Sequence, residues 1–438
     1  MIRMSMNRFA LVLLGVAVAG CGSKTISQCT TDSDCNIVYP FCDVDGAFPP
    51  SGGAKNICTI VPPGCPVDRC GCSPGETTCA GDQQTTCNTD GKSTTTDTCA
   101  LGCSTSENRC LAFKPLNGLG PALTAAAAEP AVVIPAGSTI DTDSGLIRNS
   151  ANAKINVSTL VVTGPTDIRV FLGGSFDIND VVVTGTKAVA FVSPGAVTIR
   201  GMIDASAYKN VSGPGASTAG CVGQTATYST ESVAGGGGHA TSGGQGKAVD
   251  SHGSVIAAAA GGSLASGSAL VGGCIGGGGP SAAGGGGGAV QIDSLTKIAF
   301  TITNLGFIDV GGGGARQASG INGGGGAGGL VVLEAPDIVL GNVTANGGSG
   351  GACGIDGSDA TRDQAVAPGN ACGGGAYPTF SGAGGTIDHP ATGGGGFGGG
   401  GGGGAVGVMF VNTLDGTYIS NGASIVSADV TRGMIAPI

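Results

Sequence analysis

Between residues 284 and 346, runs of glycine alternate with short, strongly apolar segments. Gly284–Gly288 leads directly into Ala289–Ile292, and the same cycle restarts at Leu330–Leu333. Over residues 298–303, large apolar side chains alternate with small ones, and this period of two indicates β-strands. Glycine has no side chain to bury, so only the apolar segments of such a chain can build a hydrophobic core.

The alternating unit recurs along the chain, each time with an apolar opening strand and a short closing segment that begins with glycine. The opening strands are Ala188–Val192, Ala289–Ile292, Gly329–Leu333 and Ala405–Val411; the closing segments are Gly201–Ala205, Gly306–Val310, Gly341–Ala345 and Gly422–Ser427. A unit that cannot bury its apolar face alone, repeated with insertions of variable length, is typical of stacked coils. The sequence therefore predicts an all-β fold, a parallel β-helix or related β-solenoid, over residues 131–438.

Three glycine-rich insertions, 206–288, 311–328 and 347–404, leave after a closing segment and return before the next opening strand. These points lie above one another in a stacked coil, so we expect the insertions to project from one edge. Ordering glycine is costly in conformational entropy and brings no side-chain burial in return. The runs are therefore either mobile or packed through backbone hydrogen bonds as polyglycine II-like strands.

The N-terminus has the pattern of a targeting segment. Arg3 and Arg8 form a basic region, and the apolar run Phe9–Val18 that follows is too short to span a bilayer. We therefore predict a signal peptide over residues 1–20, which is not part of the folded protein.

The residues that close this segment, Val18-Ala19-Gly20-Cys21, are similar to a bacterial lipobox. We predict lipidation of Cys21, a lipid-anchored tether over residues 21–28, and stable membrane attachment through several acyl chains. Gly22, in place of Asp, favours the outer membrane by analogy with the sorting rule for bacterial lipoproteins. The alternative is an ordinary secretory signal followed by a chance cysteine.

The chain is acidic, with a formal net charge of −10 over 438 residues. Removal of Arg3 and Arg8 with the signal peptide takes away two positive charges and no acidic residue, which leaves −12. This charge disfavours nucleic acid as a partner. The expected partners are the membrane, through the lipid anchor, and a polysaccharide or surface protein.

Cysteine usage indicates an oxidising compartment. Of 17 cysteines, 16 remain after Cys21 is set aside, and this even number is typical of disulfide-bonded proteins. Residues 29–110 have few large apolar side chains, so disulfides must stabilise this region. We predict two modules there, whose pairings the sequence leaves open, and one further pair of cysteines in each of the two long insertions. The candidates are Cys29, Cys35, Cys42, Cys58, Cys65 and Cys70; Cys72, Cys79, Cys87, Cys99, Cys103 and Cys110; Cys221 and Cys274; and Cys353 and Cys372.

No metal site or cofactor is predicted. The cysteines at 70 and 72 have the wrong spacing for zinc, and no histidine lies in that region. Asp356, Asp359 and Asp363 could supply oxygen ligands for Ca²⁺, but a polar, turn-rich loop is the favoured interpretation.

No catalytic residue is predicted. His239, His252 and His389 lie in loops without a nucleophile nearby in the sequence, and we expect them to be exposed.

Paired carboxylates could indicate glycoside hydrolysis. The candidates are Asp177 with Asp180, and Asp204 with Asp309 at matching positions of different coils. Thr344 and Ser427 occupy the same place in later coils, which predicts a solvent-facing position without a catalytic requirement.

Residues 111–130 resemble a linker, with three prolines around a four-alanine run. A run of four alanines is too short to form a stable helix in isolation, so no helix is expected there.

From Ile140 onward, the chain resembles a family of glycine-rich cell-surface lipoproteins of Gram-negative bacteria. The motifs that carry the resemblance are Ile140–Gly145, Gly201–Ala205, Gly288–Ile292, Leu333–Pro336 and Ala345–Gly348; the cysteine-rich segments Cys72–Gly75 and Cys79–Gly81 are similar to short modules often joined to such domains. The resemblance implies location and architecture. It transfers no activity and no catalytic residues.

The sequence favours a surface lipoprotein with a structural or adhesive role, which presents a glycine-rich edge to surface or matrix partners. The alternative is a carbohydrate-active β-helix enzyme, a polysaccharide hydrolase or lyase. Scarce aromatic residues, 4% of the chain, make the enzyme the less favoured interpretation.

Overall fold

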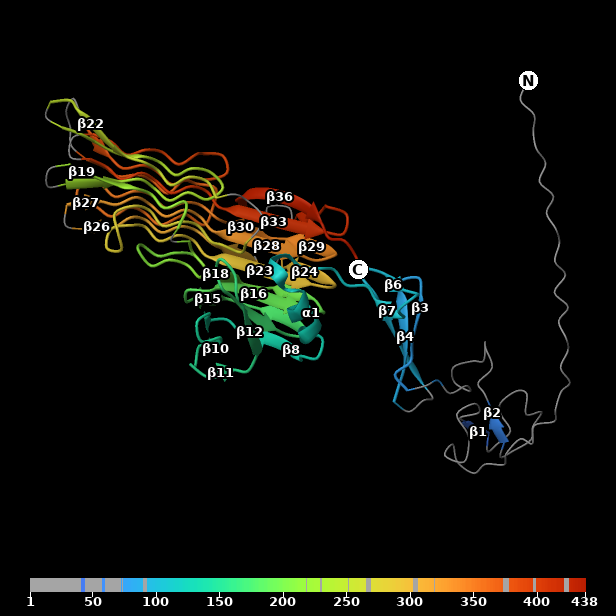
Figure 1. Cartoon of the computed structure of the whole chain (residues 1–438). Coiled ribbons are helices and arrows are strands. Elements are labelled where there is room, and N and C mark those ends of the chain that lie inside the picture. The colour runs from blue at the N-terminus through green and yellow to red at the C-terminus, as the bar shows by residue number, and fades with distance from the viewer. Residues whose placement is uncertain are drawn as a thin grey trace, which may run out of the picture. The chain divides into compact units, whose positions relative to one another are not determined.

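The computed structural model describes strands 41–43 and 57–59, residue 72, and residues 74–89 and 93–438, apart from short gaps at 218, 229–230, 251, 265–268, 302–305, 319, 373–377, 397–398 and 421–424. The described chain is nearly all β, with parallel sheets and several disulfides (Figure 1). The predicted signal peptide, tether and Cys21 lie outside the described residues.

The chain divides into two compact units: Met1–Thr78 with Gln84–Asp97, and Cys79–Gln83 with Thr98–Ile438. The strands of the cysteine-rich region are β1 (Phe41–Asp43), β2 (Ile57–Thr59), β3 (Thr77–Ala80), β4 (Gln83–Cys87), β5 (Thr94–Thr98), β6 (Cys103–Ser104) and β7 (Arg109–Cys110). Cys72 pairs with Cys87 in the first unit, and the second unit contains the disulfides Cys79–Cys103 and Cys99–Cys110. Of the first predicted module, the structure describes only the backbone of Cys42 and Cys58, which lie opposite each other on β1 and β2.

Within the described residues, three large sheets dominate the second unit. The eight-stranded sheet has the order β11 (Lys154–Ile155), β10 (Leu146–Arg148), β9 (Ser138–Asp141), β15 (Val181–Thr184), β18 (Met202–Asp204), β25 (Phe307–Asp309), β30 (Asn342–Thr344), β35 (Val426–Ser427). The seven-stranded sheet has the order β12 (Ser158–Val162), β13 (Ile168–Leu172), β16 (Ala188–Ser193), β23 (Ala289–Ser294), β28 (Leu330–Glu334), β33 (Val408–Thr413), β36 (Asp429–Met434). The six-stranded sheet has the order β34 (Ile419–Ser420), β29 (Asp337–Leu340), β24 (Lys297–Phe300), β17 (Val197–Ile199), β14 (Ser175–Ile178), β8 (Ala131–Ile134).

From β13 onward, the chain visits these sheets in a fixed cycle: the seven-stranded, then the six-stranded, then the eight-stranded sheet. Strands of successive cycles pair in parallel with matched register, as in Val189 with Val290 and Val290 with Val331. Alternate side chains of all three sheets meet in one apolar core, in which the Phe191 ring contacts the rings of Phe171 and Phe176. We call these sheets together the three-sheet body.

The expectation that residues 111–130 form no helix is wrong. A short 3-10 helix, η2 (Leu116–Gly118), precedes the α-helix α1 (Gly120–Ala126). Leu119, Leu123 and Ala126 are buried against the outer face of the seven-stranded sheet. Tertiary packing of this apolar stripe therefore stabilises a helix that is too short to persist alone.

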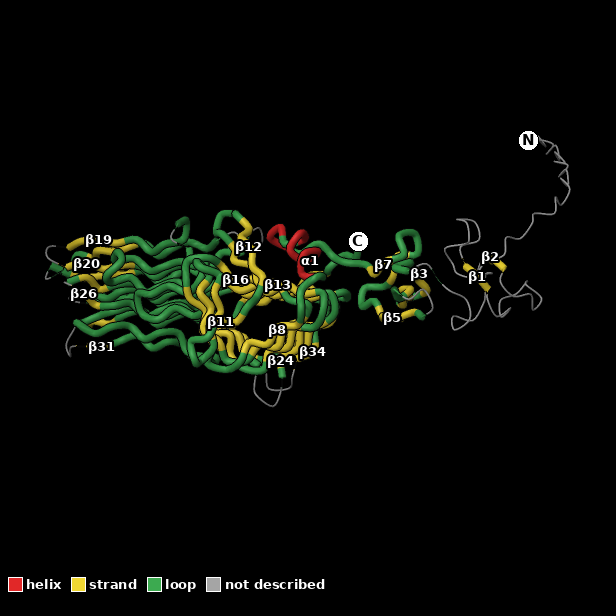
Figure 2. Tube along the Cα trace, turned by 90° about the horizontal axis from the view of Figure 1, so that it is seen from below, coloured by secondary structure: helices red, strands yellow, loops and turns green. Residues whose placement is uncertain are grey.

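The three insertions project from one side of the three-sheet body, as predicted, and run side by side in both views (Figures 1 and 2). We call the described parts of residues 206–288, 311–328 and 347–404 the glycine bundle. Short antiparallel strands lie within it: β19 (Thr225–Tyr228), β20 (Glu231–Ala234), β21 (Gly246–Val249), β22 (Val255–Ala258), β26 (Gln317–Ala318), β27 (Ile321–Asn322), β31 (Ala371–Cys372) and β32 (Thr379–Phe380). The disulfides Cys221–Cys274 and Cys353–Cys372 each join two parts of one insertion.

Backbone hydrogen bonds within the glycine bundle follow a three-residue period, which is clearest along residues 323–329. The N–H groups of Gly324, Gly325 and Gly326 donate to Gly277, Gly402 and Gly313, and those of Ala327, Gly328 and Gly329 donate to Cys274, Ala405 and Val310. Residues three apart thus bond to the same neighbouring segment.

The carbonyl groups of this segment bond to three other segments. Gly323 and Gly326 accept from Gly351 and Gly348, Gly324 and Ala327 accept from Gly284 and Gly287, and Gly325 accepts from Gly237. Among the described residues, segment 323–329 therefore has six hydrogen-bonded neighbours, whereas a strand in a sheet has at most two. Of the two alternatives left open by the sequence, the structure has the polyglycine II-like packing.

This packing requires glycine because the backbones lie too close for side chains. A Cβ atom built on Gly326 would lie 1.8 Å from the carbonyl oxygen of Gly285, and one built on Gly404 would lie 1.9 Å from the carbonyl oxygen of Gly326. Contacts of this kind involve backbone atoms, which cannot move aside as a flexible side chain can. The glycine composition is therefore a steric condition of the fold.

We predict that Gly326→Ala lowers the free energy of unfolding by about 3 kcal/mol, because the added methyl group overpacks a buried site. Gly262→Ala is the matched control, since a Cβ there meets nothing within 4 Å and its stability should change by about 0.5 kcal/mol or less. Urea unfolding of both variants measures the difference. Equal effects at the two positions would contradict the steric explanation.

Candidate functional site

The parallel strands of the eight-stranded sheet end at the edge where the insertions begin, and polar residues occupy these ends. Asp204, Asp309, Thr344 and Ser427 lie in register on β18, β25, β30 and β35. The prediction that this position faces solvent is wrong for the last three, since Asp309 is only 2% exposed and Thr344 and Ser427 are fully buried. The glycine bundle covers them because its backbone, without side chains, can approach closely.

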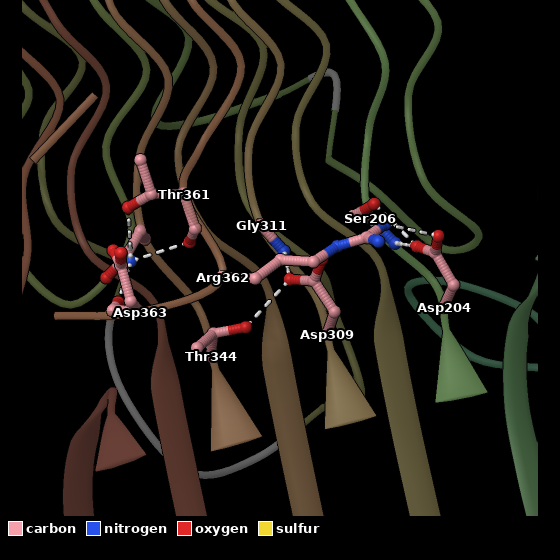
Figure 3. A network of polar contacts seen from close by, with 9 residues as sticks. Asp204, Ser206, Asp309, Gly311, Thr344, Thr361, Arg362 and Asp363 are labelled. Carbon is pink, nitrogen blue, oxygen red and sulfur yellow. Dashed lines mark hydrogen bonds and ion pairs between the residues drawn. The ribbon is translucent and has the colours of Figure 1, made fainter. Parts of the chain in front are cut away.

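Arg362, from the third insertion, bridges the two carboxylates of this row (Figure 3). Its Nε donates to Asp309 Oδ2 at 2.8 Å, and its Nη2 donates to Asp204 Oδ2 at 2.6 Å. The loop that carries Arg362 is fixed by Asn346, whose Nδ2 donates to the carbonyl oxygens of Thr361 at 2.8 Å and Asp363 at 2.7 Å. Asp204 and Asp309 lie just before the first and second insertions. Arg362 therefore links the starts of these two insertions to the third insertion.

The second oxygens of both carboxylates are also bonded. Asp309 Oδ1 accepts from Thr344 Oγ1 at 2.9 Å and from the Gly311 N–H at 3.0 Å. Asp204 Oδ1 accepts from the hydroxyl group of Ser206 at 2.6 Å and from its N–H at 3.1 Å. Burial raises the pKa of Asp309 and nearby Asp204 acts in the same direction, although the hydrogen bond from Arg362 opposes them.

A cavity of about 800 Å³ is lined by the first two residues of this row, Asp204 and Asp309. Asp204, Asp309 and Arg362 line it together with Asp359, and Tyr208 lies among its apolar lining residues. A glycosidase needs one carboxyl group free to give a proton and a second free to act as base or nucleophile. Here both carboxylates bond to the same guanidinium group, so the arrangement suits ligand binding better than proton transfer.

The other candidate glycosidase pair, Asp177 and Asp180, does not line this cavity. Asp177 pairs with Arg200 at 2.7 Å, whereas Asp180 accepts from the Met202 N–H at 2.9 Å. The two carboxylates therefore serve separate structural contacts.

Each aspartate of the calcium alternative accepts at least one backbone N–H group. Asp356 accepts from Gln317, Asp359 from Lys209 and Gly314, and Asp363 from Ala365. In the described part of the chain, no group of three or more His, Cys, Asp or Glu side chains could hold a metal ion.

The expectation that all three histidines are exposed is wrong for His239. His252 and His389 are exposed, whereas His239 is 4% exposed and its Nε2 lies 3.2 Å from the carbonyl oxygen of Val271. Burial lowers the pKa of His239 to about 4, so this histidine is neutral at physiological pH.

A second buried acidic pair, which sequence reasoning missed, lies on the outer face of the seven-stranded sheet. Asp293 on β23 is opposite Glu334 on β28, and both are buried. The two-residue period of the strand could have revealed this pair. Val290 and Ile292 face the core, so Gln291 and Asp293 must point to the other face of the sheet. That face is covered by residues 116–126, which the sequence had suggested to be a linker.

Amide groups surround this pair. Glu334 Oε2 accepts from the Leu116 N–H at 2.7 Å and Glu334 Oε1 from Asn412 Nδ2 at 3.0 Å, while Gln291 Nε2 donates to both carboxyl groups. Burial raises the pKa of Asp293 well above its usual range, and the neighbouring charge of Glu334 adds to this effect. Burial also raises the pKa of Glu334. The pair therefore retains a proton at pH values where exposed carboxyl groups are ionised.

Comparison of the chain with protein-family models, with curated proteins and with solved structures finds no match. In the described part of the chain, no helix has both the length and the apolar character needed to cross a membrane. Geometry and sequence together are therefore the basis of the functional assignment.

We predict that stability falls as the pH rises above the ordinary carboxyl pKa range, because the folded state binds the proton of the Asp293–Glu334 pair more tightly than the unfolded state does. The pair stabilises the fold fully at pH values below the ordinary carboxyl pKa values, which are 3.8 for Asp293 and 4.5 for Glu334. This stabilisation is lost as the pH rises through the raised pKa values of the folded state. Asp293→Asn keeps a neutral hydrogen-bonding group there and should reduce this dependence. Unfolding midpoints of both proteins across the range measure it, and identical pH profiles would contradict the assignment.

Proposed function

We propose that this chain is a lipoprotein of the bacterial outer membrane, exposed at the cell surface, with a structural or adhesive role. The observation that carries the proposal is the glycine bundle, in which side-chain-free segments are hydrogen-bonded to neighbours on several sides. Such a bundle is stiff because each segment is held by many backbone bonds, and its interior offers no side chains for chemistry. A stiff projection suits the presentation of a binding surface to a partner outside the cell.

We further propose that the three-sheet body is a parallel β-helix. The fixed cycle of the chain through three sheets, the matched parallel register and the single apolar core support this architecture. In such a coil every insertion at the same corner emerges at the same edge, which explains why separate insertions can form one bundle.

Two parts of the glycine bundle offer side chains to a partner. One is the end where β19, β22, β26 and β27 lie in Figure 1, on which Val255 is 64% exposed. The other is the cavity at the base of the bundle, beside Asp204 and Arg362. The glycine-rich edge is therefore a scaffold, and binding specificity comes from these two places.

Attachment through Cys21 is tested by metabolic labelling with a palmitate analogue. Cells that produce the full chain should label it, and Cys21→Ala should remove the label because the acceptor thiol is lost. The adhesive role is tested by the attachment of these cells to polysaccharide-coated and matrix-coated surfaces, compared with cells that produce Cys21→Ala.

The proposal expects the wild-type chain to increase attachment and Cys21→Ala to abolish the increase. Unlabelled wild-type protein would contradict the lipid anchor. Labelled protein that attaches cells to none of the surfaces would contradict the adhesive role.

A further inference from the structure

Three large apolar side chains lie exposed among the residues that line the cavity. Tyr208 is 69% exposed, Val211 64% and Val182 45%. Large apolar side chains gathered at one concave place indicate a binding site more strongly than the same residues scattered over a surface.

The turn that carries two of these side chains is fixed in an unfavourable backbone conformation. Tyr208 and Val211 exchange two backbone hydrogen bonds, of 3.0 and 2.9 Å, across the two-residue turn between them. Lys209 in this turn has a φ of 51°, which side-chain-bearing residues seldom adopt. Strained backbone persists only where the surrounding structure enforces it, and it is concentrated at functional sites.

The third insertion enforces this conformation. Asp359 Oδ1 accepts from the Lys209 N–H at 2.7 Å and from the Gly314 N–H at 2.8 Å. Lys209 Nζ also donates to the carbonyl oxygen of Gly357 at 2.7 Å. The backbone at Tyr208 is therefore held by a rigid turn, and this turn would lose little conformational entropy when a ligand binds.

The charged residues limit which ligands fit. Three carboxylates, those of Asp204, Asp309 and Asp359, line the cavity with one guanidinium group, that of Arg362. The Lys209 ammonium group lies 3.9 Å from Asp359 Oδ2, so these groups together carry two positive charges against three negative ones. The remaining negative charge disfavours an anionic ligand. Arg362 bonds to two of the carboxylates and so opposes the binding of a simple cation.

We propose that this cavity binds a neutral oligosaccharide, with one sugar ring stacked on Tyr208. A sugar ring has an apolar C–H face, which suits Tyr208, Val211 and Val182, and hydroxyl groups, which can donate to the carboxylates and accept from guanidinium N–H groups. The inference rests on the proposed adhesive function and gives it a ligand class and a site. Binding breaks no covalent bond in the ligand. This agrees with the carboxylates of Asp204 and Asp309, which are both bonded to Arg362 and are therefore poorly placed for proton transfer.

The test is the binding of the full chain to an array of neutral oligosaccharides (linear glucans, mannans and galactans) beside uronate oligomers of equal length. A reducing-sugar assay on the same samples measures turnover. Four variants accompany the wild type: Tyr208→Ala, Tyr208→Phe, Val211→Ala and Val133→Ala. Val133 is the matched control for Val211, because it is 59% exposed against 64% for Val211, lies on β8 of the three-sheet body and does not line the cavity.

The proposal expects binding of at least one neutral oligosaccharide, without turnover and with weaker binding of uronates. Tyr208→Ala should weaken binding at least about tenfold, which corresponds to the loss of one aromatic stacking contact. Tyr208→Phe should keep most of the affinity, since the ring remains, and Val211→Ala should weaken binding more than Val133→Ala does.

Oligosaccharide binding that is unchanged in Tyr208→Ala and Val211→Ala would overturn the cavity assignment and leave the adhesive function standing. The same holds if no neutral oligosaccharide binds although the chain still attaches cells to a coated surface. Failure of both measurements would overturn both proposals. Release of reducing ends would replace adhesion with an enzymatic function.

Discussion

The backbone hydrogen bond between side-chain-free segments is the interaction on which this structure depends. A glycine residue loses more conformational entropy on ordering than any other and buries no side chain, so a glycine run is ordered only if its peptide groups are satisfied. Segment 323–329 meets this condition through six neighbouring segments. Because the neighbours come from three separate insertions, no single insertion could be ordered in this way alone.

The three-sheet body contains the large apolar core that the glycine bundle lacks. Its strands bury large apolar side chains in one core and return the chain to the same edge in every cycle, so that the insertions start side by side. At the junction, the buried row from Asp309 to Ser427 and the ion bridge of Arg362 join body and bundle. The cavity that we propose as an oligosaccharide site lies at this junction, where Asp359 of the third insertion bonds to the turn that carries Tyr208.

Much of this architecture could be predicted from the sequence because the repeat is explicit. The alternation of large and small side chains around Ile298 and Phe300 predicted β-strands. The common exit point of the insertions predicted that they project from one side. The burial of Asp309 could not be predicted, since the groups that cover it, among them the Arg362 side chain of the third insertion, contact it only after folding. The α1 helix was missed because packing against the sheet, and not the local propensity of its alanines, stabilises it. Asn346 was used only as part of the segment Ala345–Gly348, which carries the family resemblance, although it bonds to the carbonyl groups on both sides of Arg362.

Hydrogen–deuterium exchange of the full chain, followed by mass spectrometry, tests the central claim most directly. If the glycine bundle is held by backbone hydrogen bonds, amides in segments 323–329, 345–351 and 401–405 should exchange as slowly as those of the core strands β23 and β28. Exchange of these segments at the rate of an unstructured peptide, while β23 and β28 remain protected, would contradict the account.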